Sequence, residues 1–232
     1  MLQIRRANER GHADHGWLNA YHTFSFSDFY DDQWVHFRNL RVMNEDRVAP
    51  GMGFGMHPHR DMEIVTIVLS GEIMHKDSMG NEGIIKAGDV QRMSAGTGVM
   101  HSEFNPSKTE LLHLYQIWIL PEKHGVMPSY EQKMFSDTDT WNKLTLVASP
   151  TGESESVTIG QDVKLYRTTL EAGKKLELPL LQGRSVWVQI IKGKAKVNGE
   201  ELVTSDGVGI SAEKNISIEA IEETEFLLFD LN

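Results

Sequence analysis

Two histidines separated by a single residue are candidate metal ligands. His57 and His59 lie in the stretch GFGMHPHRDME, residues 53–63, after a glycine-rich run and before an apolar segment. In an extended strand, residues i and i+2 point to the same face, so both rings would enter one space. Pro58 between them lacks an amide proton, which favours a strand at an edge or at the mouth of a barrel. The spacing predicts half of a metal site.

A second pair with the same spacing lies in GTGVMHSEFN, residues 96–105. His101 and Glu103 share strand parity, so their side chains also converge. If the two strands are neighbours in one barrel, three imidazole nitrogens and one carboxylate meet. Such a set suits Fe(II), Mn, Ni, Cu or Zn and leaves positions open for water or substrate. The alternative for either pair alone is a chance spacing of surface residues.

Other residues near these pairs have expected supporting roles. Glu63 shares the parity of His57 and His59, and we expect it to be a reserve ligand or to hydrogen-bond an imidazole. Phe54 and nearby methionines are expected to form an apolar pocket wall. These methionines are Met52, Met56, Met62, Met93 and Met100. We interpret the remaining histidines as structural, strand, loop or surface residues: His12, His15, His22, His36, His75, His113 and His124.

The elements that must position these residues are short strands. Apolar and β-branched runs recur along the chain, separated by turns rich in Gly, Asn and Asp. This pattern of short strands and turns predicts an all-β protein built as sandwiches or jelly-roll barrels. A short helix is expected at residues 128–135. The clearest strand-like runs are residues 40–42, 64–69, 114–119, 186–191 and 225–229.

A faint internal repeat suggests two β-domains in tandem. VLSGEI at residues 68–73 is echoed by IIKGKA at residues 190–195, each followed by a polar turn. We expect an N-terminal domain at 1–133 and a C-terminal domain at 134–232, joined within the polar, strand-poor stretch 127–142. All ten histidines lie at or before His124, and cysteine is absent. A transition-metal site therefore belongs to the first domain, because the second offers neither imidazole nor thiolate.

The composition narrows the class of protein. The 232 residues carry a formal net charge of −10 and are 40% hydrophobic, which is ordinary for a globular chain that buries a core. An acidic surface repels phosphate backbones, so we expect no direct binding of nucleic acid. No segment has the roughly 20 apolar residues of a membrane span, and the first residues lack a secretory signal. We expect a cytoplasmic monomer that does not bind membranes.

Several segments resemble the pirin family of the cupin superfamily. The first cupin motif, G-x5-H-x-H-x3–4-E-x6-G, is followed by Gly51, His57, His59, Glu63 and Gly71. Seven residues rather than six precede the last glycine, which argues against Glu63 as a ligand. The second motif, P-x-G-x2-H-x3-N, is matched at Gly98, His101 and Asn105, with Gly96 in the proline place. The resemblance covers most of residues 10–120, including HGWLNAYHTFSFSDFYDD and AGDVQRMSAGTGVMHSEFN.

The resemblance implies two jelly-roll barrels packed face to face, with metal held only by the N-terminal one. It implies His57, His59, His101 and Glu103 as ligands of one divalent metal, with Fe(II) expected and Zn, Cu, Ni, Mn or Co as alternatives. Bacterial pirins of this kind are associated with quercetin 2,3-dioxygenase activity, which opens the central ring of a flavonol with O₂ and releases carbon monoxide. Glu103 would be the general base, and the partners would be a small flavonol-like aromatic and O₂.

Two other functions fit the same residues. Some pirins are metal-dependent regulators that bind a protein partner according to the redox state of the metal, without catalysis. Another cupin reaction is also compatible with the ligand set, such as sugar epimerisation or a different ring cleavage. Metal-free epimerases would not need all four ligands, so metal analysis distinguishes that class.

Overall fold

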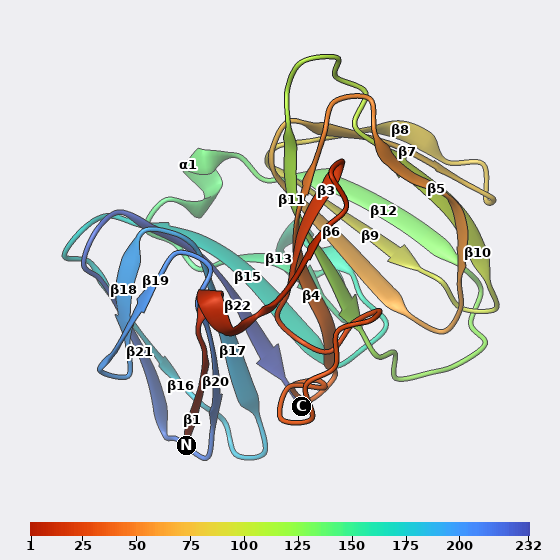
Figure 1. Cartoon of the computed structure of the whole chain (residues 1–232). Coiled ribbons are helices and arrows are strands. Elements are labelled where there is room, and N and C mark those ends of the chain that lie inside the picture. Colours follow the sequence, from red (N-terminus) through yellow and green to blue (C-terminus); the bar gives the residue numbers. More distant parts are fainter.

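Residues 1–232 are all described by a computed structural model, in which the chain forms two β-barrels (Figure 1). Each barrel combines a seven-stranded sheet with a four-stranded sheet, so the expected all-β, two-barrel architecture is confirmed. The helical elements are short: α1 (Asp137–Thr140) and the 3₁₀ turns η1 (Ala7–Glu9) and η2 (Glu153–Glu155). None of the helices has the length and hydropathy needed to span a bilayer.

The first barrel contains most of the N-terminal half. Its larger sheet has the strand order β12-β9-β6-β11-β4-β3-β2, and its smaller sheet has the order β5-β10-β7-β8. The larger sheet comprises β12 (Ser129–Met134), β9 (Asp89–Ser94), β6 (Glu63–Ser70), β11 (Leu112–Ile119), β4 (Leu40–Val48), β3 (Leu18–His22) and β2 (Gly11–Asp14). The smaller sheet comprises β5 (Gly53–His59), β10 (Val99–Phe104), β7 (Glu72–Asp77) and β8 (Glu82–Lys86).

The second barrel repeats this plan. Its sheets have the orders β1-β20-β17-β22-β15-β13-β14 and β16-β21-β18-β19. The larger sheet comprises β1 (Leu2–Arg5), β20 (Gly207–Ser211), β17 (Ser185–Lys192), β22 (Thr224–Leu231), β15 (Val163–Leu170), β13 (Thr145–Ser149) and β14 (Val157–Thr158). The smaller sheet comprises β16 (Lys175–Pro179), β21 (Asn215–Ala220), β18 (Lys194–Val197) and β19 (Glu200–Val203).

The two sheet systems have corresponding strand orders, which supports the internal repeat. β14 is an exception, because it pairs parallel with β13, whereas β2 and β3 are antiparallel. The repeated sequences VLSGEI and IIKGKA form the turns from β6 to β7 and from β17 to β18. Gly71 and Gly193 occupy these turns with φ of +77° and +88°. A Cβ at Gly193 would lie 2.1 Å from the carbonyl oxygen of Glu223, so this turn excludes side chains.

The largest apolar core lies between the barrels rather than inside either of them. It joins residues of the first larger sheet, such as Val65 and Ile117, to residues of the second, such as Leu165 and Trp187. The two seven-stranded sheets therefore pack against each other, which confirms the face-to-face arrangement. Separate apolar clusters fill the interior of each barrel.

Two expectations about chain segments are wrong. The helix expected at residues 128–135 is instead β12, whose six residues all pair with β9 at the edge of the first larger sheet. The open edge of β9 provides hydrogen-bond partners for the backbone N–H and C=O groups of this segment, although its own sequence is polar. The segment Leu2–Arg5, placed in the N-terminal domain by the expected division, pairs as β1 with β20 of the second barrel (Figure 1).

Candidate metal centre

The two histidine-bearing segments are adjacent antiparallel strands. His101 on β10 pairs directly with His57 on β5, and Val99 pairs with His59. The ring centroids of His57 and His101 are 4.3 Å apart, and His59 lies 4.9 Å from each of them. One nitrogen of each ring lies within 4.8 Å of one nitrogen of the other two. The structure therefore brings the three predicted imidazoles together.

A β-bulge in β5 adjusts which side chains face the interior. The register shifts between His101 and Glu103, which pair with His57 and Phe54 respectively, so β5 carries one extra residue opposite Ser102. The bulge allows Phe54 and His57, which have opposite parity in a regular strand, to line the same cavity. The carbonyl oxygen of Gly55 in the bulge accepts a 2.8 Å hydrogen bond from Nδ1 of His57. This bond leaves Nε2 free and fixes the orientation of the ring.

Glu103 approaches His101 together with His75. One of its carboxylate oxygens falls within 4.8 Å of nitrogens of His101 and His75, in a group separate from the three-histidine one. Nε2 of Gln116 donates a 2.9 Å hydrogen bond to Oε2 of Glu103, whereas Oε1 is buried without a partner. Glu103 is thus held from one side and offers its second oxygen to the site.

The donor atoms fit a divalent transition metal. Both ring nitrogens of His101 are buried without any hydrogen-bond partner, which is unusual for a native side chain. Burial, together with the nearby rings of His57, His59 and His75, lowers the pKa of His101 to about 2. Burial and His57 lower the pKa of His59 to about 4. These imidazoles are neutral at pH 7, the form that binds a metal without first losing a proton.

Two carboxyl groups in the same cavity have raised pKa values. Burial raises the pKa of Glu103 to about 7, although the hydrogen bond from Gln116 opposes the shift. Burial also raises the pKa of Asp46 to about 7, with further contributions from the charges of Glu103 and Glu45. A bound cation would favour the ionised form of Glu103 and lower its pKa again.

The site opens into a cavity of about 460 Å³ with aromatic walls. Trp17, Phe54 and Trp118 line it, and Trp17 meets Phe54 edge to face at 5.3 Å. Trp118 also packs against the ring of His59 at 5.0 Å. Phe54, an expected pocket residue, is among the residues that line the cavity. No lysine or arginine lines the cavity.

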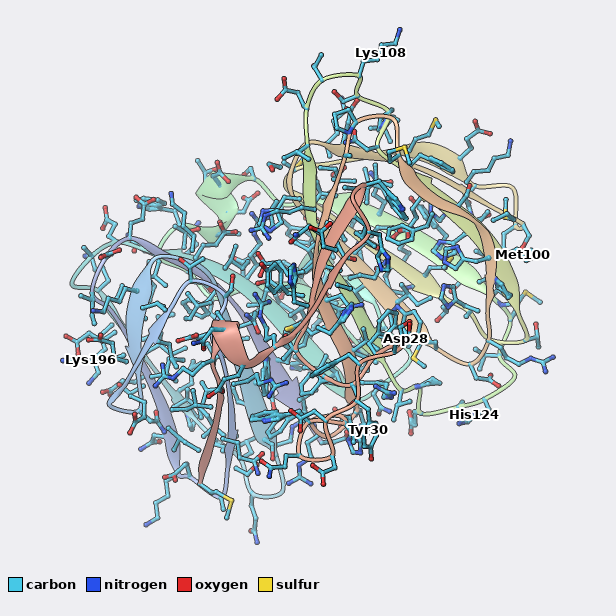
Figure 2. The ribbon with its side chains drawn as sticks, in the orientation of Figure 1. Asp28, Tyr30, Met100, Lys108, His124 and Lys196 are labelled. Carbon is cyan, nitrogen blue, oxygen red and sulfur yellow. The ribbon has the colours of Figure 1, made fainter.

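The methionines do not form this wall, contrary to expectation. Met56 and Met100 alternate with the proposed ligands along β5 and β10 and are 50% and 44% exposed on the outer face. Figure 2 shows Met100 projecting outward from the first barrel. Met93 packs instead in a separate cluster with Ile64 and Val99. Successive side chains in a strand point to opposite faces, so the methionines next to the inward-facing histidines must point outward.

Glu63 is neither a ligand nor a partner of an imidazole, which corrects a second prediction. It accepts hydrogen bonds from the hydroxyl of Ser94 and, at 3.0 Å, from the backbone N–H of Gly160 in the second barrel. β5 ends at His59, and Asp61 in the connecting turn has φ of +47°. Because of this turn, Glu63 belongs to β6 in the other sheet. The alternation of side chains along β5 therefore does not predict which way Glu63 points.

Two histidines interpreted as structural lie at the site. His75 is fully buried, with its ring centroid 5.5 Å from that of His101. Its Nδ1 accepts a 3.2 Å hydrogen bond from Gln91, and its Nε2 lies 3.2 Å from Asp77. His22 lines the cavity and bonds to Asn44. The inward parity of His75 and Asp77 in the strand EIMHKD was a signal that could have identified the first of these.

The second barrel lacks the polar interior of the first. Across the first barrel, paired residues on neighbouring strands form a polar row. These residues are Thr66, Gln116, Asn44 and His22. Val188 is the counterpart of Thr66 in the second barrel, because it precedes Gly193 by the same interval as Thr66 precedes Gly71. The row of paired residues that contains Val188 is hydrophobic apart from one phenol. That row is Val188, Leu228, Tyr166 and Leu146. This polar row thus has no counterpart at the equivalent positions of the second barrel.

Comparisons with known proteins agree with this architecture. The family model described as Pirin matches residues 3–119, and the one described as quercetinase C-terminal cupin domain matches residues 146–231. A protein named quercetin 2,3-dioxygenase from Escherichia coli strain K12 is 50% identical, over 100% of this chain and 99% of its own length. A pirin-like protein of Caulobacter vibrioides is 41% identical over 99% of both chains.

A solved structure shares the whole fold. The bacterial pirin YhhW from Escherichia coli, crystallised in complex with nickel(II), superposes with a TM-score of 0.96 at 49% identity. The match covers 100% of this chain and 99% of that one.

Proposed function

The chain belongs to the pirin family, and we propose that it is a metal-dependent dioxygenase that cleaves the central ring of flavonols such as quercetin with O₂ and releases carbon monoxide. One observation carries the proposal: three imidazoles and a carboxyl with an unpartnered oxygen lie at an aromatic-walled cavity. The relatives named quercetin 2,3-dioxygenase support the choice of substrate.

We assign His57, His59, His101 and Glu103 as the residues that would hold one divalent transition metal, with Fe(II) preferred. When bound, the metal would supply a Lewis acid that lowers the pKa of the flavonol 3-hydroxyl. The hydrogen bond from His57 to Gly55 orients the remaining ring nitrogen. The four donors leave positions open for a substrate oxygen.

Glu103 is the proposed general base. Its Oε2 is held by Gln116, and its Oε1, which has no partner in the protein, could accept the 3-hydroxyl proton when it does not bind the metal. An ionised carboxylate at this position is suited to taking up the proton and returning it. Trp17, Phe54 and Trp118 would hold a flat ring system by stacking and exclude water from it.

We further propose that catalysis resides in the N-terminal domain, residues 1–133 apart from the β1 segment, and that residues 134–232 support it. The shared core between the larger sheets would hold β4 and β11, which carry Asn44, Asp46 and Gln116 toward the cavity. The apolar interior of the second barrel offers no comparable set of ligands.

The test is turnover by an anaerobically iron-loaded preparation. Admission of O₂ to protein and quercetin should consume O₂, bleach the flavonol absorbance and release carbon monoxide. Metal-loaded protein that consumes no O₂ and leaves the flavonol intact would refute the proposal. A redox-dependent regulator would show that result together with partner binding that differs between Fe(II) and Fe(III) forms, and an epimerase would work without metal.

A further inference from the structure

The cavity has a second polar wall that the proposed reaction does not use. His22 on β3 and Asn44 and Asp46 on β4 line it, beside the proposed metal ligands. Asp46 is 5% exposed, and its Oδ1 is buried with no hydrogen-bond partner in the protein. Buried polar atoms are nearly always paired, so an orphaned oxygen at a ligand cavity points to a partner supplied by the ligand.

This wall presents acceptors. Nδ1 of His22 lies 2.9 Å from Oδ1 of Asn44, and because an amide oxygen only accepts, Nδ1 carries the proton. Nε2 of His22 is therefore a lone-pair acceptor. Oδ1 of Asp46 accepts a hydrogen bond whether the carboxyl is ionised or neutral. A ligand that satisfies this wall must bring hydrogen-bond donors.

The charges around the cavity narrow the ligand class further. No lysine or arginine lines it, and Asp46 and Glu103 are both carboxyl groups. A carboxylate or phosphate ester at this wall would lie beside Asp46 with no lysine or arginine to pair with, which is unfavourable in a desolvated site. A neutral aromatic with hydroxyl substituents brings both the apolar surface and the donors that the walls require.

We propose, on the basis of the function proposed above, that Asp46 accepts a hydrogen bond from a ring hydroxyl of the ligand other than the one at the metal. Asp46 is then a specificity residue that selects polyhydroxylated, uncharged aromatics over those with only the metal-facing hydroxyl. His22, held by Asn44, offers an additional acceptor on the same wall. Discrimination by a site that bonds a substrate hydroxyl arises because an analogue without that hydroxyl leaves the buried acceptor unpaired.

The test compares two ligands on metal-loaded protein under anaerobic conditions, so that binding is measured without turnover. Quercetin carries several ring hydroxyls, whereas 3-hydroxyflavone carries only the metal-facing one. Dissociation constants follow from quenching of tryptophan fluorescence, because Trp17 and Trp118 line the cavity. Asp46→Ala should weaken quercetin binding by about tenfold, the loss expected for one hydrogen bond, and leave 3-hydroxyflavone binding nearly unchanged.

Asp46→Asn keeps the shape of the side chain and one acceptor oxygen, so it should show a smaller loss, again confined to quercetin. It supplies the same comparison if Asp46→Ala does not fold. Equal effects on both ligands, or no effect on quercetin, would overturn the role of Asp46 while leaving the proposed function in place. Failure of wild-type protein to bind either compound would overturn both.

Discussion

Gln116 and Glu103 form the polar contact that orients the carboxyl of the candidate metal centre. Nε2 of Gln116 donates to Oε2 of Glu103 at 2.9 Å, and Oγ1 of Thr66 donates to Oε1 of Gln116 at 2.8 Å. The bond from Thr66 fixes which end of the amide faces Glu103. A chain of two hydrogen bonds from the larger sheet therefore sets the direction of a carboxyl on the smaller one.

Gln116→Leu should weaken metal binding. The substitution leaves the carboxyl of Glu103 without its donor, and loss of such outer partners typically costs about 10- to 100-fold in metal affinity. Thr66→Val removes only the bond that orients the amide and should have a smaller effect in the same direction. Competition with a chelator of known affinity measures both. Unchanged affinity in Gln116→Leu would show that Glu103 is positioned by other contacts.

Gly53→Ala should disturb the site through the backbone. A Cβ at Gly53 would lie 2.2 Å from the carbonyl oxygen of Glu103 and 2.5 Å from Cα of Phe104, so β5 and β10 must separate. These strands carry the proposed ligands, and metal affinity should fall. Gly55→Ala is the matched control, because its Cβ would meet no atom within 4 Å. Equal metal affinities for the two variants would contradict the prediction.

Metal should stabilise the folded protein through His101. A ligand that binds only the native state at 100 times its Kd raises the free energy of unfolding by about 2.7 kcal/mol. Thermal unfolding with and without added metal should show this increase in wild type and none in His101→Ala, which should also purify without metal. His124→Ala is the control, since His124 is 74% exposed and outside the cavity. Full metal occupancy in His101→Ala would mean that His101 has another role.

Glu45 should make the stability of the protein depend on pH in the acid range. Burial alone would raise the pKa of Glu45, but the hydrogen bond with His113 and the charges of Arg10 and Arg47 outweigh it and hold the pKa well below its ordinary value of 4.5. Because the folded pKa is depressed, the stabilisation is fully present above pH 4.5 and is lost as the pH falls below that value.

Glu45→Gln should therefore lower the free energy of unfolding at pH 7 by about 3–5 kcal/mol, since it leaves buried Arg10 without its anion. The difference from wild type should shrink as the pH falls from 5 toward 3, as followed by chemical denaturation. Glu82→Gln, which removes an exposed pair with Lys76, should leave the pH dependence unchanged. A difference that stays constant with pH would exclude ionised Glu45 as its source.

Much of the fold and of the candidate site could be predicted from local sequence. The alternation of side chains in a strand is a local rule, so His57 with His59, and His101 with Glu103, could be assigned to inward faces. The repeat around Gly71 and Gly193 predicted two similar barrels, because a turn without room for a side chain requires glycine, which can be recognised in the sequence. The absence of histidine after His124 placed the metal-binding potential in the first half.

Other features depended on which strands pair and in what register. Glu63 lies outside the predicted site because the chain turns at Asp61 and enters a different sheet. Residues 129–134 form strand β12 because they pair with the open edge of β9. Gln116 and Asp46 have no sequence signal that links them to the histidines, since β11 and β4 reach the cavity only through the closure of the barrel. The sequence determined which side chains face inward along each strand. The tertiary structure decided which of them meet, because pairing between distant strands is set by long-range packing rather than by local periodicity.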